Sequence, residues 1–157
     1  MAKKKPRPTI SHLATSRFSR RGLRRYFEYR DLGVSRATGG RAHAHVIRAR
    51  PEKAPHGDWH YHDCKVQFTY VLKGWVKMQY EGQKPIVMKA GSCFTQPPRI
   101  RHREISHSKD LEMIEVTAPQ RFKTYDAKVR YLQPTRFGEV LAPVGAVQPV
   151  GADRLAR

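Results

Sequence analysis

The sequence predicts an all-β fold in a single domain, built as a sandwich or small barrel of short strands. Residues 40–118 contain successive segments in which apolar and polar residues alternate, and Gly or Pro residues separate these segments. The same region shows no alternation of strands with helical patterns, which would indicate a parallel sheet covered by helices. The chain of 157 residues is long enough for one domain and short for two.

Seven segments have the composition and periodicity of strands. In the third of them, Trp75–Tyr80, the side chains of Val76, Met78 and Tyr80 share one face, and the residues between them share the other. Short strands separated by turn residues are typical of a sandwich or small barrel. In chain order the predicted strands are Ala42–Arg50, Val66–Leu72, Trp75–Tyr80, Pro85–Met88, Ser92–Thr95, Arg101–His107 and Leu111–Thr117.

The charge of the chain is strongly positive and unevenly placed. Thirty-one Lys and Arg residues against 13 Asp and Glu give a formal net charge of +18, and residues 1–25 carry nine of the bases and no acid. Residues 1–25 therefore predict a basic, disordered arm that makes weak, nonspecific contacts with nucleic acid through phosphate groups. Residues 26–118 would form the barrel. Residues 119–157, rich in Pro and Gly, predict a partly irregular C-terminal extension.

The cysteines and the hydropathy pattern bear on the location of the chain. The sequence has no run of 18 apolar residues, so we expect no membrane contact. The basic N-terminus is not followed by the apolar region of a secretory signal. Cys64 and Cys93 lack CxxC spacing, which argues against a disulfide scaffold and a cysteine-based zinc finger. We expect a cytoplasmic protein with two buried, inert thiols, although Cys93 shares strand parity with Thr95 and could instead line a cavity.

Four polar side chains form the strongest chemical pattern. His60 and His62 are one residue apart, so on an extended strand they point to the same face, and Gln67 follows five residues later. His102 lies 40 residues after His62, at the start of another predicted strand. In a closed barrel these side chains could converge on one point. Imidazole nitrogens with one amide oxygen suit a divalent first-row transition metal better than Ca²⁺ or Mg²⁺.

The chain resembles the cupin family in two separated motifs. Residues 57–74 are similar to the first cupin motif, which has HxH, then Glu, then Gly seven positions later; residues 91–106 are similar to the second, with its Gly, Pro, Gly, His and terminal Asn. The resemblance covers about residues 40–118 and implies a single cupin barrel, the jelly-roll-like double-stranded β-helix, which often pairs as a homodimer. It also implies one divalent metal, Zn, Fe, Ni or Mn, held by His60, His62, Gln67 and His102.

Three residues depart from the family pattern. Gln67 replaces the usual Glu, Arg99 replaces the second-motif Gly, and Ser106 replaces the terminal Asn. A neutral amide at Gln67 leaves the full charge on the metal and cannot serve as general base. Glu104, which shares a strand face with His102, is the nearest candidate for acid–base catalysis, and a salt bridge to a neighbouring arginine explains it equally well. Arg99, or one of the arginines beside it, is a candidate to bind a substrate anion, against the alternative of a solvated basic loop.

Three functions remain open at this point. Certain sugar-converting and polyketide-cyclising cupins carry the His-His-Gln-His pattern, which favours a metal-dependent isomerase, lyase or cyclase acting on a small, oxygenated, anionic molecule. The first alternative is an iron-dependent dioxygenase with the same four ligands. The second is a non-enzymatic cupin that binds a metabolite and has a regulatory role. His43 and His45 repeat the HxH spacing without a third ligand, so we expect them at the surface or at an interface.

Overall fold

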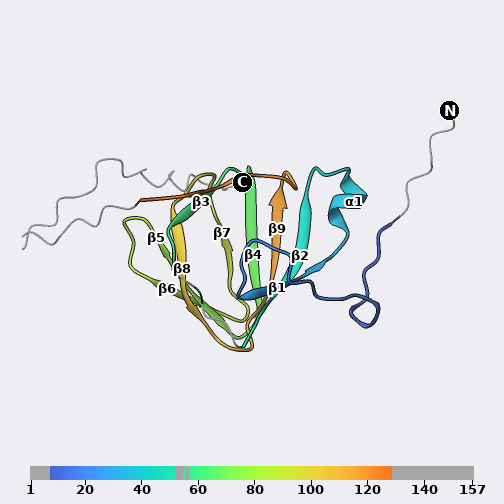
Figure 1. The fold of residues 1–157 in the computed structure, drawn as a ribbon, viewed down its shortest axis with the longest axis horizontal. Coiled ribbons are helices and arrows are strands. Elements are labelled where there is room, and N and C mark those ends of the chain that lie inside the picture. The colour runs from blue at the N-terminus through green and yellow to red at the C-terminus, as the bar shows by residue number, and fades with distance from the viewer. Residues whose placement is uncertain (1–7, 52–54, 56, 129–157) are drawn as a thin grey trace, which may run out of the picture.

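The computed structural model of the chain describes residues 8–51, 55 and 57–128. It contains ten strands, one short α-helix and one 3-10 turn within these residues, in the order and with the bounds that follow (Figure 1): η1 Leu13–Thr15, β1 Phe27–Asp31, α1 Val34–Thr38, β2 His43–Ala49, β3 His60–His62, β4 Val66–Lys73, β5 Trp75–Tyr80, β6 Ile86–Lys89, β7 Cys93–Thr95, β8 His102–His107, β9 Glu112–Ala118 and β10 Thr124–Asp126. The all-β prediction is confirmed.

The strands form two five-stranded sheets that face each other (Figure 1). The first sheet has the order β1-β2-β9-β4-β7 and the second has the order β10-β3-β8-β5-β6. All strand pairs are antiparallel. Strands that are neighbours in a sheet are often distant in sequence, so residues from both predicted motifs meet in the space between the sheets.

The apolar core lies between the sheets. The predicted alternation in β5 is confirmed, since Val76, Met78 and Tyr80 are buried and the residues between them are only partly so. Val71 of β4 and Leu111 before β9 are fully buried against this face. Burial of each such side chain stabilises the fold by about 1.5–3 kcal/mol, so the core holds the two sheets together.

The seven predicted strands all occur, with bounds that differ by one residue at most. Five elements were not predicted by range: η1, β1, α1, β3 and β10, although His60 and His62 of β3 were expected on an extended strand. In β1 the apolar Phe27 and Tyr29 are buried and alternate with Glu28 and Arg30, so its periodicity is that of a half-buried strand. The strand β10 pairs with β3 and lies beyond the predicted barrel boundary at residue 118.

The segment before β1 contacts the barrel. Ser19 forms an antiparallel bridge with Tyr29, and the backbone N–H of Arg24 donates to the Tyr29 hydroxyl at 2.9 Å. Gly22 lies against the same ring, and a Cβ atom at this position would be 2.1 Å from Tyr29 Cε2. The predicted arm of residues 1–25 therefore includes a segment, residues 19–24, that packs on the barrel. Residues 1–7 and 129–157, which hold the rest of the arm and most of the predicted C-terminal extension, lie outside the described residues.

No helix in the described part of the chain is long and apolar enough to cross a membrane.

Candidate metal centre

Two adjacent strands of the second sheet carry three histidines to one place. His60 and His62 lie on β3, where their parity directs both inward, while Tyr61 points the other way and stacks on Tyr125 with ring centroids 5.0 Å apart. His102 begins β8 and is paired with His60 across the two strands. The predicted convergence of these three residues is confirmed: one ring nitrogen of each lies within 4.8 Å of those of the other two.

The remaining nitrogen of each imidazole is occupied by the protein. Nδ1 of His60 lies 2.9 Å from the carbonyl oxygen of Asp58, and Nδ1 of His102 lies 2.9 Å from that of Ile100. A carbonyl oxygen can only accept, so in both rings Nδ1 carries the proton and Nε2 keeps a lone pair. Nδ1 of His62 lies 2.9 Å from the Thr124 hydroxyl oxygen, which belongs to β10. Such contacts fix the ring orientation that a metal ligand needs.

The electrostatic environment of the triad also favours neutral imidazole over the protonated form. Burial lowers the pKa of His60, His62 and His102 to about 4 in each case, and nearby positive charge adds to the effect. The imidazoles are therefore neutral at physiological pH, which is the form that binds a metal. Three buried, neutral, pre-oriented imidazoles fit a divalent transition metal.

Gln67 faces the same cavity from the opposite sheet. It lies on β4, is buried, and its Nε2 donates to Oε1 of Glu115 at 2.9 Å. Because a carboxylate oxygen accepts a hydrogen bond, this contact identifies the nitrogen of the Gln67 amide. The other amide atom, Oε1, carries lone pairs that can bind a metal, and Cys64 Sγ lies 4.0 Å from it. The amide oxygen has the chemistry expected of a fourth ligand.

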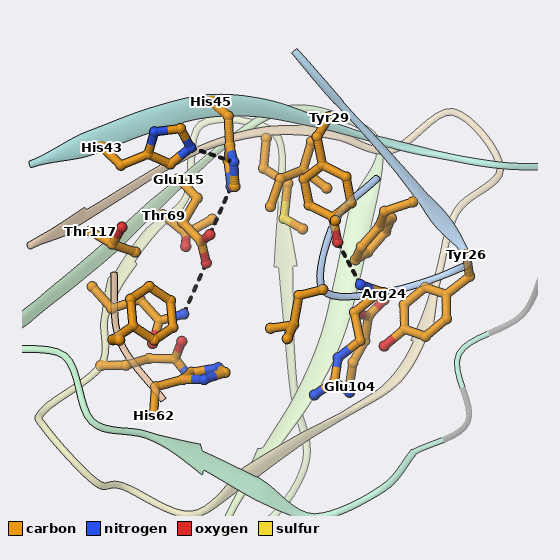
Figure 2. A pocket seen from close by; sticks show the side chains of 18 of the residues that line it. Arg24, Tyr26, Tyr29, His43, His45, His62, Thr69, Glu104, Glu115 and Thr117 are labelled. Atoms are coloured by element: carbon orange, nitrogen blue, oxygen red, sulfur yellow. Dashed lines mark hydrogen bonds and ion pairs between the residues drawn. The ribbon is translucent and has the colours of Figure 1, made fainter. Parts of the chain in front are cut away.

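Glu115 is a functional candidate that the sequence analysis missed. Its carboxylate accepts from Gln67 on one oxygen and lies 2.8 Å from His45 Nε2 on the other, and His45 Nδ1 is 3.1 Å from His43 Nε2 (Figure 2). Burial raises the pKa of Glu115, but the contacts with His45 and Gln67 outweigh it, so the net pKa is lowered and the carboxylate is ionised. His45 then donates to Glu115, which leaves its Nδ1 to accept from His43.

The expected position of His43 and His45, at the surface or an interface, is wrong. Both residues are half-buried and line the central cavity, where they form a hydrogen-bonded chain to Glu115 (Figure 2). Nδ1 of His43 is buried and has no hydrogen-bond partner among the described residues. Among the described residues the triad of His60, His62 and His102 is the only group of this kind that could hold a metal.

The cavity between the sheets has a volume of about 470 Å³. Its wall combines the histidine triad with aromatic and aliphatic side chains such as Phe27, Ile47 and Phe94. Several buried polar atoms in this wall have no hydrogen-bond partner within the described part of the chain: Arg24 Nη2, His43 Nδ1, Gln96 Nε2 and Thr117 Oγ1. Unpaired buried polar atoms cost free energy, so this wall presents polar groups whose hydrogen-bonding capacity is not satisfied by the described residues.

Glu104 lines the cavity, as expected from its place on the same strand face as His102. The hydrogen-bond partners of its carboxyl group are His107 and Tyr26 rather than a neighbouring arginine. Its Oε1 lies 2.5 Å from His107 Nδ1, and it is also hydrogen-bonded to the Tyr26 side chain. Burial raises the pKa of Glu104, and the contact with His107 opposes this. The carboxyl group is therefore held in the cavity wall by two neighbouring side chains.

The arginines around His102 lie outside the cavity. Arg99 is exposed, and its guanidinium lies 5.8 Å from the centroid of the Tyr61 ring. The backbone φ of Arg99 is +64°, a conformation that glycine adopts more easily than other residues, and this explains the Gly at this position of the second cupin motif. Arg101 and Arg103 have the opposite strand parity to His102 and contact Glu81 and Gln79. The cavity wall instead includes the arginines of the segment before β1, namely Arg17, Arg21 and Arg24.

The two cysteine thiols differ in their exposure to solvent. Cys64 is buried, as predicted, and burial raises the pKa of its thiol. The prediction that Cys93 is buried is wrong, because Cys93 lies on the solvent side of β7 and is exposed. Phe94, with the opposite parity, is the β7 residue that lines the cavity.

Comparison with known proteins supports the fold. Residues 48–117 match the family model described as Cupin domain. No protein of curated function shows significant sequence similarity to the chain. The polyketide cyclase RemF from Streptomyces resistomycificus superposes with a TM-score of 0.62 and 14% identity, over 83% of this chain and 88% of that one. KdgF from Halomonas sp. superposes with a TM-score of 0.59 and 16% identity, over 73% of this chain and 96% of that one.

A third similar structure is the oxalate decarboxylase of Bacillus subtilis, a protein with Mn(II) centres. It superposes with a TM-score of 0.52 and 11% identity, over 66% of this chain and 29% of that one. At these identities the three structures define the fold and do not define the reaction.

Proposed function

Because the chain contains a cupin domain and has the cupin fold, we propose that it is a metal-dependent enzyme of the isomerase, lyase or cyclase type. Its substrate would be a small, oxygenated, anionic molecule. The observation that carries the proposal is the buried triad of His60, His62 and His102, three neutral imidazoles whose other nitrogens are held by the protein. Gln67 supplies the fourth ligand from the facing sheet.

A divalent metal at this position would polarise a carbonyl or hydroxyl oxygen of the substrate. The four protein ligands add no negative charge, so the ion would keep its full Lewis acidity. Glu115 accepts from the Gln67 amide nitrogen, which leaves the amide oxygen as the atom that could bind the metal, and aromatic side chains line part of the cavity. The similar structures of RemF, a polyketide cyclase, and of oxalate decarboxylase, which has Mn(II) centres, are consistent with this class of reaction.

His43 is the group best placed to accept a proton from the substrate. Burial lowers the pKa of His43, with a further contribution from His45, so its imidazole is neutral at physiological pH. Its Nε2 lies 3.1 Å from His45 Nδ1, and its Nδ1 is buried and has no hydrogen-bond partner among the described residues, so that nitrogen is available to take up a proton. Glu104 is the second candidate for acid–base catalysis, and its contacts with His107 and Tyr26 set its orientation.

Metal analysis of the purified protein tests the proposal. We expect about one transition metal per chain, and its loss from His60→Ala and from His102→Ala because each change removes a ligand. His12→Ala is the matched control, because His12 is exposed and distant in sequence from the motifs. Equal metal content in wild type and in both ligand variants would refute the metal site and leave a non-enzymatic, metabolite-binding cupin as the leading interpretation.

An iron-dependent dioxygenase remains the second candidate function, because the same neutral ligand set suits ferrous iron. Oxygen consumption separates the two. Bound iron with substrate-dependent uptake of O₂ would favour the dioxygenase, and turnover of a substrate without uptake would favour the isomerase, lyase or cyclase.

We also propose that the protein is a homodimer. The outer face of β4 exposes three large apolar side chains in a row, Val66, Tyr70 and Leu72, with relative exposures of 45%, 39% and 43%. Ile114 and Val116 of the adjacent β9 extend this face. An apolar sheet face of this kind is typical of an interface, and a second copy offers the same surface.

Light scattering should show a dimer for wild type and a monomer for Tyr70→Glu. A monomeric wild type would refute the proposal.

A further inference from the structure

Of the three arginines that the segment before β1 contributes to the cavity wall, Arg24 has a buried guanidinium nitrogen. Arg24 lines the cavity together with the histidine triad, and it belongs to the part of the chain that the sequence analysis assigned to a basic arm. Figure 2 shows its side chain entering beside Tyr26 and Glu104, across the cavity from His62 and His43. This residue comes from outside both cupin motifs.

The backbone around Arg24 is fixed against the barrel. Its own N–H donates to the Tyr29 hydroxyl at 2.9 Å, and Ser19 pairs with the backbone of Tyr29 through two hydrogen bonds of 2.8 and 2.9 Å. Gly22 packs so closely on the Tyr29 ring that no side chain fits between them. Tyr29 is buried, so the ring cannot move aside freely. These contacts set the direction from which the guanidinium enters the cavity.

The guanidinium keeps an unused donor inside the protein. Arg24 Nη2 is buried and has no hydrogen-bond partner among the described residues. Glu104, the nearby carboxyl group, is already engaged by His107 and Tyr26. Glu115 is engaged by Gln67 and His45. Leaving a charged donor buried and unpaired is costly, and a guanidinium is well suited to hold a carboxylate or phosphate.

We propose that Arg24 forms the anion subsite of the cavity and binds a carboxylate or phosphate group of a ligand whose less polar body contacts Phe27, Ile47 and Phe94. This inference deepens the proposed function, on which it rests for the role of that ligand as substrate. Arg24, rather than Arg99, orients the molecule, so that its oxygen-bearing end faces the histidine triad, which lines the same cavity.

Three compounds that share a phenyl ring and differ in the attached group test the subsite on the full-length protein: benzoate, phenyl phosphate and the neutral benzamide. Binding is measured by calorimetry at low ionic strength, with the protein as purified and after removal of metal by a chelator, because anions also bind metal ions. Wild type should bind at least one anion at least tenfold more tightly than benzamide. The preferred anion identifies the substrate group as carboxylate or phosphate. No preference for either anion over benzamide would overturn the proposal.

Substitutions then locate the subsite. Arg24→Ala should weaken binding of the preferred anion at least tenfold with metal and without it, Arg24→Gln should do the same, and Arg24→Lys should retain part of the affinity. Arg36→Ala removes the same charge from an exposed position on α1 and should change affinity less than twofold. Circular dichroism and metal content check that the variants fold. Equal weakening in Arg36→Ala, or none in Arg24→Ala, would overturn the proposal.

The two proposals fail in different ways. A wild-type protein without metal that still binds an anion through Arg24 would refute the metal site alone. A metal-loaded protein whose anion affinity does not depend on Arg24 would refute the subsite alone.

Discussion

The amide nitrogen of Gln67 donates a hydrogen bond of 2.9 Å to the carboxylate of Glu115, and His45 occupies the other oxygen of that carboxylate at 2.8 Å. Gln67 stands where the related cupin motif has Glu. A carboxylate at position 67 would have no N–H to donate and would face a second carboxylate in a buried site. The presence of an amide at position 67 is therefore matched to the presence of an acid at position 115.

The contact between Gln67 and Glu115 predicts a pH-dependent loss of stability in Gln67→Glu. Two buried carboxyl groups at this distance cannot both ionise without strong repulsion, so the folded state would keep a proton that the unfolded chain releases. The free energy of unfolding should then fall as pH rises above about 4.3, the ordinary pKa of Glu. Near pH 8 we expect a deficit of about 1–3 kcal/mol relative to wild type, measured by urea denaturation of the metal-free protein at pH 5 and pH 8.

The exchanged pair provides the control. In the double variant Gln67→Glu with Glu115→Gln, the amide at position 115 can donate to position 67 and accept from His45, so most of the stability should return. The interpretation would be refuted if Gln67→Glu matched wild type at pH 8, or if the double variant were as unstable as the single one.

The histidine triad predicts how the metal-free protein responds to acid. The pKa of His60, His62 and His102 is about 4 in the folded chain, against about 6.5 in the unfolded one. Between these values the unfolded chain binds more protons, so the free energy of unfolding should decrease as pH falls from about 6.5 towards about 4. His102→Gln should show a weaker dependence than wild type in chemical denaturation, and the exposed control His12→Gln should not. Identical pH profiles for wild type and His102→Gln would contradict this explanation.

The sequence predicts the strands well wherever one face is apolar and the other polar. In β5 the buried side chains Val76, Met78 and Tyr80 alternate with more exposed ones, as periodicity requires. The positions of His60, His62 and His102 were predicted from the register of two motifs, which carries long-range information that composition lacks. Their convergence in the structure shows that this register is maintained by the pairing of β3 and β8.

Glu115 was missed for a physical reason. Around the cavity the usual polarity of a sheet is inverted: Glu115 and Thr117 of β9 point inward, while Ile114 and Val116 lie on the outer face. The same inversion occurs in β4, where Gln67 and Thr69 point inward. Alternation alone would place the apolar residues inside. A polar stripe between apolar residues on two paired strands is the signal that could have indicated a functional wall.

Arg24 and Cys93 escaped prediction for other reasons. The segment containing Arg24 has a composition typical of a disordered arm, and its order comes from Tyr29 and Gly22, a tertiary contact that periodicity does not reveal. Cys93 lies in the three-residue edge strand β7, which is too short for alternation to identify its buried face.

The two cysteines should differ in reactivity in the folded protein. Cys93 is exposed, while Cys64 is buried and burial raises the pKa of its thiol, which reduces the fraction of reactive thiolate. Ellman's reagent at pH 8 should therefore modify one thiol per chain within minutes, and the second only after denaturation. Cys93→Ser should abolish the fast reaction and Cys64→Ser should leave it intact. A fast reaction that survives in Cys93→Ser would show that Cys64 is accessible.

The packing of Gly22 on Tyr29 predicts that residues 19–24 belong to the folded domain. In Gly22→Ala the new methyl group would lie 2.1 Å from Tyr29 Cε2, so either the buried ring or the segment must move. Overpacking of this kind costs about 1–3 kcal/mol, and a displaced segment would also withdraw Arg24 from the cavity. Leu23→Ala is the matched control, because Leu23 is 53% exposed and its truncation should cost less than about 0.5 kcal/mol. Urea denaturation gives the stabilities, and benzoate and phenyl phosphate titrations report the subsite. A Gly22→Ala protein with wild-type stability and wild-type anion affinity would mean that the segment does not depend on this contact.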